Sequence, residues 1–122
     1  MTKPVYQAKA EFFKVLGHPA RVQVLEVLRS GERSVNALVS EIGIESSHLS
    51  QQLGIMRRAN IVQTRKEGST VFYSVADRNL YDLLDVARRI ITSSLAESQE
   101  LLDELRAELT GASDSDGVFR LE

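Results

Sequence analysis

The sequence predicts a mainly α-helical domain with one small β-hairpin, arranged as a winged helix-turn-helix. Three observations predict this fold class. Apolar residues recur every three to four positions in several segments, which is typical of amphipathic helices. Two of these segments are short and joined by about three residues. Directly after them, β-branched and aromatic residues gather on either side of a glycine, which is typical of a hairpin.

The composition limits the class of protein. The chain has 122 residues, no cysteine and a net charge of −2, which predicts one domain without disulfides, thiolate metal ligands or a cysteine redox switch. No apolar run approaches the ~18 residues that span a bilayer, and the N-terminus has no signal-peptide core. We therefore expect a cytoplasmic protein without a membrane partner.

The charge is divided unevenly along the chain. Residues 1–75 hold ten Lys/Arg and six Asp/Glu (+4), whereas residues 76–122 hold five and eleven (−6). Such asymmetry indicates an anion-facing part and a separate part.

Residues 5–16 and 19–28 predict the first two helices. Gly17 can end the first helix, and Pro19 can begin the second because proline at the first helical position loses no hydrogen bond. His18 is best explained as a local cap or a packed imidazole. In the first helix Tyr6, Lys9, Phe13 and Leu16 share one side, and in the second Val22, Leu25 and Leu28 form the buried stripe, widened by Val24.

Residues 35–42 predict a third, short helix. Ser34 can cap it, because its hydroxyl can accept hydrogen bonds from the free N–H groups of the first turn. Gly43-Ile44 then forms a tight link to the next segment.

The stretch from Gly43 to Val62, GIESSHLSQQLGIMRRANIV, predicts a helix with two unlike faces. Leu49, Leu53 and Met56 form one apolar stripe. The other side carries hydroxyls, amides and guanidiniums, with no carboxylate after Glu45. An ordinary surface helix usually mixes both charge signs, so this face favours contact with base edges and phosphates.

Residues 61–66 and 70–75 predict the two strands of the hairpin, with Glu67-Gly68-Ser69 between them. The tip is cationic and carries hydroxyls, so it could reach a phosphate or the minor groove. Hairpin tips are polar in most proteins, however, and this tip alone indicates little.

A long last helix is predicted from a cap at Asp77 to about residue 109. Its apolar residues keep a spacing of three and four over roughly 30 residues, or ~45 Å, which is longer than one small domain can cover. A second copy of the chain is the simplest partner for this stripe. Residues 1–110 should therefore form one DNA-binding and dimerisation domain, and the acidic residues 111–122 a flexible tail. The apolar series is Leu80, Leu84, Ala87, Ile91, Leu95, Ser98, Leu102, Leu105 and Leu109.

Three stretches resemble the ArsR/SmtB family of small bacterial winged-helix repressors: AEFFKVLGHPARVQVLEVL, ERSVNALVSEIGIESSHLSQQLGIMRRANIV and RKEGSTVFYSV, about residues 8–76. The resemblance implies a homodimer packed through the first and last helices, with two recognition helices one DNA turn, ~34 Å, apart on an inverted repeat. It also implies repression by blocking a promoter. The motifs in these stretches are similar to those of a cysteine-free subset of the family. One alternative is an inducer that is a small molecule held between the long helices. The other is that the protein has no inducer.

Carried over residue by residue, the resemblance implies two groups of DNA-binding residues. Gln51 or Gln52 could read adenine through N6 and N7. Gln52 stands where many relatives have histidine, so the DNA preference is expected to differ. The base-contact candidates are Ser46, Ser47, His48, Ser50, Gln51 and Gln52, and the backbone-contact candidates are Arg57, Arg65, Lys66, Ser69 and Thr70.

The chain departs from the metal sensors of this family. Ser34 and Asn36 stand where many relatives bind metal through a C-V-C pair, and neutral side chains cannot replace thiolates for a soft metal. The last helix has carboxylates but no histidine, and His18 and His48 lie in different elements. We therefore expect neither a metal site nor a cofactor.

Two other classes of function are less favoured. A winged-helix dimer could act as a protein-interaction module, or as a small-molecule sensor with little DNA specificity of its own. Acidic residues on the recognition face would favour the protein-interaction module, and none follows Glu45 there. An enzyme would need a nucleophile motif, a phosphate loop or paired carboxylates beside a base, and we find none of these in the sequence.

Overall fold

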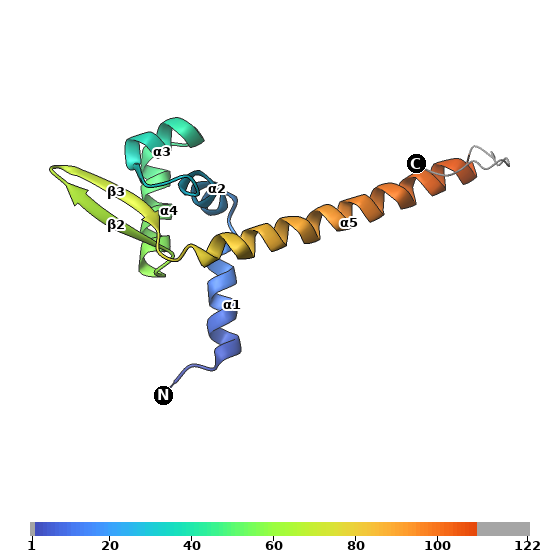
Figure 1. Cartoon of the computed structure of the whole chain (residues 1–122), viewed down its shortest axis with the longest axis horizontal. Helices are drawn as coiled ribbons and strands as arrows, with labels where there is room; N and C mark the ends of the chain where they lie inside the picture. The colour runs from blue at the N-terminus through green and yellow to red at the C-terminus, as the bar shows by residue number, and fades with distance from the viewer. Residues whose placement is uncertain (1, 110–122) are drawn as a thin grey trace. The chain divides into compact units, whose positions relative to one another are not determined.

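A computed structural model describes residues 2–109 of the chain. Its elements follow one another as α1 (Val5–Leu16), α2 (Pro19–Leu28), β1 (Arg33–Ser34), α3 (Val35–Ile42), α4 (Ser46–Arg58), β2 (Val62–Glu67), β3 (Thr70–Val75) and α5 (Asn79–Leu109) (Figure 1). The strands form an antiparallel sheet in the order β1-β3-β2. The predicted winged helix-turn-helix is confirmed. The chain divides into one unit that ends at Arg78 and another that begins at Asn79.

The core of the first unit lies where α2, α3 and α4 pack on one another, with β2 against α4 (Figure 1). The predicted stripe of α4 is confirmed, because Leu49, Leu53 and Met56 are fully buried. In α2, Leu25 and Leu28 are buried as predicted, whereas Val22 is only half-buried. The fully buried side chains of this unit are Val24, Leu25, Leu28, Leu38, Leu49, Leu53 and Met56.

Local hydrogen bonds fix the starts of α2 and α3. The His18 Nδ1 accepts from the Ala20 N–H at 3.1 Å, directly before Pro19 at the first helical position. The Ser34 Oγ accepts from the Ala37 N–H at 3.2 Å, so the predicted cap is confirmed. A left-handed Gly43, with φ of 81°, then ends α3 and turns the chain toward α4.

The sheet has one strand that the sequence did not predict. In β1, Arg33 pairs with Tyr73 and Ser34 with Phe72 of β3. Two residues are too few to show the alternating pattern by which a strand is recognised. The first strand of the hairpin is shifted by one residue from the predicted 61–66, because Ile61 lies outside it and Glu67 pairs with Thr70 across the turn. Gly68 makes this tight turn with a φ of 64°.

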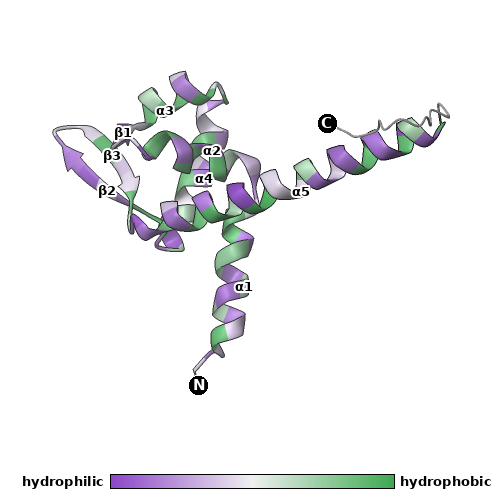
Figure 2. Cartoon of the chain, turned by 45° about the vertical axis from the view of Figure 1, so that its right-hand side comes forward, coloured by the Kyte–Doolittle hydropathy of each residue, from purple (hydrophilic) through white to green (hydrophobic). Residues whose placement is uncertain are grey.

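The second unit is described through α5, a helix of 31 residues. Its hydrophobic and hydrophilic residues alternate along its whole length (Figure 2). The helix continues to Leu109, the last described residue, and the predicted acidic tail at 111–122 lies outside the described residues. Among residues 2–109, no helix has the length and apolar character needed to cross a membrane.

The cap of α3 can be tested by mutation. Ser34→Ala should lower the free energy of unfolding by ~1 kcal/mol, since one N–H of the first turn loses its acceptor. Urea denaturation followed by circular dichroism would measure the loss. Ser40→Ala is the matched control, because Ser40 is an exposed serine inside the same helix. Equal effects of the two substitutions would contradict the cap.

Candidate nucleic-acid interface

Helix α4 buries one face and exposes the other. Its apolar residues point into the core, so the hydroxyl, amide and guanidinium side chains face solvent. Ten of the eleven predicted DNA contacts are exposed. These are Ser46, Ser47, His48, Ser50, Gln51 and Arg57 on α4, and Arg65, Lys66, Ser69 and Thr70 on the hairpin.

Gln52 is the exception, and the expectation that it reads a base is corrected. Its side chain is only 5% exposed, and its Oε1 accepts a hydrogen bond from the Arg21 Nε at 2.6 Å. The sequence held a signal for this. Gln52 lies three residues after Leu49 and four before Met56, which is within the apolar stripe of α4. An amide held inside the protein cannot present its polar edge to a base.

The first turn of α4 carries two local contacts. The Ser47 Oγ donates to the Glu45 Oε1 at 2.7 Å, so this hydroxyl can accept a further hydrogen bond but has already used its proton. The His48 ring lies edge-on to the His18 ring, with the centroids 6.2 Å apart. Ser46, Ser50 and Gln51 are exposed beside them.

The wing holds its arginine in an ion-pair network rather than free. The Arg65 Nη2 lies 2.7 Å from the Glu32 Oε1, and its Nη1 lies 2.9 Å from the Glu67 Oε1. The guanidinium carbon also lies 4.8 Å from the centre of the Phe72 ring. Glu32 stands just before β1, so Arg65 connects the hairpin to the turn after α2.

Lys66, next to Arg65 on β2, is a freer cation. Neither Lys66 nor Arg57 forms an ion pair within the part of the chain that the structure describes, and both are exposed. A lysine of this kind can approach a phosphate without first breaking a salt bridge. The hairpin lies beside α4 (Figure 1), so the fold offers these two cations on neighbouring elements.

Within residues 2–109, no group of three or more His, Asp or Glu side chains is placed to hold a metal ion. His18 uses its Nδ1 to cap α2. The carboxylates of Glu32 and Glu67 are engaged with Arg65.

Comparison with known proteins assigns the family. The model of the family described as bacterial regulatory protein, arsR family, matches residues 18–64. The HTH-type transcriptional regulator Rv0081 of Mycobacterium tuberculosis is 47% identical over 107 residues, which cover 87% of this chain and 94% of that protein. The chain belongs to the ArsR family. The crystal structure of Rv0081 agrees with this assignment, with a TM-score of 0.72 over 80% of this chain and 98% of that chain.

Two further relatives have informative names. The biofilm growth-associated repressor of Agrobacterium fabrum is 41% identical over 76 residues, which cover 62% of this ArsR-family chain and 65% of the relative. The homodimeric winged helix-turn-helix DNA-binding domain of Mb0332 from Mycobacterium bovis has 25% identity and a TM-score of 0.69. That likeness covers 76% of this chain and 86% of the other.

Sequence reasoning missed two residues that bear on this interface of the ArsR-family chain. Arg21 pairs with Gln52, which lies 31 residues away in the chain. Glu32 pairs with Arg65, which lies 33 residues later in the chain. Neither pairing has a local sequence pattern, since both depend on the packing of separate elements.

The Arg65–Glu32 pair predicts a specific titration. The hydrogen bond from Arg65, with its charge, holds the pKa of the Glu32 carboxyl below its usual range. Arg65→Gln should therefore return this pKa toward that range, as NMR titration of the side-chain carboxyl carbon would measure. Because the unfolded chain binds this proton more tightly, the pair stabilises the fold above the unfolded pKa. That stabilisation is lost as the pH falls through the folded pKa.

Lys66→Gln is the matched control for this titration. It removes a cation from the neighbouring strand position and should leave the pKa of Glu32 low. If Glu32 titrated alike in the wild type and in Arg65→Gln, the ion pair would not exist in solution.

Proposed function

We propose that the protein is a homodimeric transcriptional repressor that binds an inverted-repeat operator in the cytoplasm and needs no metal to do so. Base contacts come from the exposed face of α4, and the wing contacts the phosphate backbone. The name of the Agrobacterium relative supports repression, and the Mb0332 domain supports DNA binding as a homodimer.

The observation that carries the proposal is the exposed face of α4. From Ser46 to Arg58 the chain has no carboxylate, and the exposed side chains are hydroxyls, an imidazole, an amide and two guanidiniums. Serine and glutamine side chains can pair with base edges in the major groove, and arginine can pair with phosphates. The opposite face holds the helix to the core through Leu49, Leu53 and Met56.

Metal independence rests on the chemistry of the available donors. The sequence has no cysteine and only two histidines. His18 and His48 lie with their ring centres 6.2 Å apart, but the His18 Nδ1 is engaged as a helix cap. Neither α3 nor α5 carries a thiolate or an imidazole for a transition metal.

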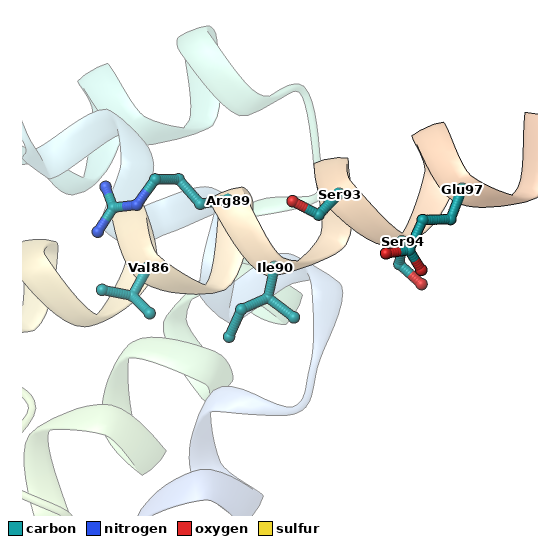
Figure 3. A pocket seen from close by; sticks show the side chains of 6 residues that line it. All are labelled: Val86, Arg89, Ile90, Ser93, Ser94 and Glu97. Atoms are coloured by element: carbon teal, nitrogen blue, oxygen red, sulfur yellow. The ribbon is translucent and has the colours of Figure 1, made fainter.

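Exposed apolar residues on two helices support the homodimer. Among residues 2–109, every exposed large hydrophobic side chain lies on α1 or α5. One stretch of α5 bears Val86, Ile90 and the small Ser93 and Ser94, with Arg89 and Glu97 beside them (Figure 3). Faces of this kind are normally covered by a partner. The exposed residues are Val5, Tyr6 and Phe13 on α1, and Val86, Ile90, Ile91, Leu95, Leu101, Leu102, Leu105 and Leu109 on α5.

The proposed function is tested by fluorescence anisotropy with purified, chelator-treated protein. The DNA comes from upstream of the protein's own gene, with a scrambled duplex for comparison, at several salt concentrations. We expect selective binding that added Zn²⁺ does not change. Selectivity only after metal is added would contradict metal independence. Binding to neither duplex by a folded dimer would favour a protein-interaction module, and activation of a reporter gene would contradict repression.

Substitutions of Gln51 and Lys66 should have different effects on DNA binding in the same assay. Gln51→Ala should weaken operator binding by ~1–3 kcal/mol and change binding to scrambled DNA little, because an amide reads a base edge. Lys66→Ala should weaken binding to both duplexes and reduce the salt slope by about one, because lysine neutralises a phosphate. Equal losses on both duplexes for Gln51→Ala would show that Gln51 is not a base reader.

The dimer surface can be tested on α5. Leu95→Glu places a charge in the apolar stripe and should shift the protein to monomers, because a buried unpaired carboxylate is costly. Sedimentation equilibrium would measure the change. Ala96→Glu adds the same charge one residue later, on the other side of the helix, and should leave the dimer intact. If both variants stayed dimeric, α5 would not form the interface.

A further inference from the structure

The buried amide of Gln52 connects α4 to α2. Its Oε1 accepts from the Arg21 Nε at 2.6 Å, and its side chain is 5% exposed. Among residues 2–109, Gln52 is the one buried residue with a charged or amide side chain. A buried amide without a partner is destabilising, so this hydrogen bond restricts where α4 can lie relative to α2.

The same guanidinium also holds the end of α1. The Arg21 Nη1 donates to the Val15 carbonyl oxygen at 3.1 Å. Val15 is the second-last residue of α1, so its carbonyl is among those that have no partner inside the helix. A cation at this end also interacts favourably with the helix dipole. The rigid fork of a guanidinium suits two acceptors in different directions, which an ammonium group on a flexible chain does not.

A second contact joins the α1–α2 junction to the recognition helix. The His18 ring meets the His48 ring edge-on, with centroids 6.2 Å apart. His18 is three residues before Arg21, and His48 is four residues before Gln52. The two contacts therefore lie about one turn apart along α4, and about as far apart between the start of α2 and Arg21. Together they define the direction of the α4 axis relative to α2 as well as its position.

We propose that Arg21 is a positioning residue for DNA recognition. By bridging the Val15 carbonyl of α1 and the Gln52 amide of α4, it sets the orientation from which the exposed face of α4 meets the bases. Gln51 is adjacent to Gln52, so any rotation of α4 that releases Gln52 also turns Gln51 away. This role rests on the proposed DNA-binding function.

The test compares Arg21→Met, Gln52→Met and the double variant. Each single variant should lower the melting temperature, because one polar group stays buried without its partner. The double variant should recover the melting temperature, because neither polar group remains. Operator Kd should nevertheless rise roughly tenfold in all three variants, while the Kd on scrambled DNA stays unchanged. The anisotropy is measured at a temperature at which every variant is folded.

Two further variants separate positioning from general packing. Gln52→Glu keeps an acceptor for the guanidinium and should retain operator selectivity. Gln63→Met makes the methionine substitution at an exposed position of β2 and should change neither quantity. A double variant that regained both stability and operator selectivity would overturn the proposal, since Arg21 would then serve packing alone.

A measurement without DNA distinguishes failure of this proposal from failure of the proposed function. NMR residual dipolar couplings report the orientation of the α4 amides relative to those of α2. In the wild type, one alignment tensor should fit the couplings of both α2 and α4. In the double variant, the α4 couplings should no longer fit the tensor obtained from α2. Unchanged couplings would overturn the positioning role. Absence of operator selectivity in the wild type would overturn the proposed function, and the couplings would then decide whether Arg21 orients α4.

Discussion

The burial of Leu49, Leu53 and Met56 is the constraint on which the rest of the structure depends. These side chains anchor α4 in the core formed with α2 and α3. A helix of 13 residues held on one side must present its other side to solvent. The polar face of α4 is thus exposed because its apolar face is needed inside, and the fold and the candidate interface have the same origin.

Apolar burial fixes α4 in the core but is non-directional, so it leaves rotation and sliding only loosely defined. Directional polar contacts restrict this rotation and sliding. The Arg21–Gln52 hydrogen bond lies at the buried edge of α4. On the wing, Arg65 performs a comparable task by pairing with Glu32 and Glu67. Both arginines join segments that are more than 30 residues apart in the chain.

The distribution of exposed apolar residues separates two roles within the chain. In the described residues, α2, α3, α4 and the hairpin expose no large hydrophobic side chain, whereas α1 and α5 expose eleven. The elements that would meet DNA are therefore polar outside, and α1 and α5 carry the apolar surface that we propose for the dimer. Arg21 contacts both kinds of element, because it bonds α1 through Val15 and α4 through Gln52.

The sequence by itself determined the order of the elements, the stripe of α4, the Ser34 cap and the ArsR-family assignment. Each of these depends on residues close together in the chain, through helical period, capping chemistry or motif spacing. Only the tertiary structure decided that Gln52 faces Arg21, that Arg65 is neutralised by Glu32, and that β1 joins the sheet. A polar side chain within an apolar stripe faces the core only if a distant partner satisfies it there, and that partner is brought near by packing alone.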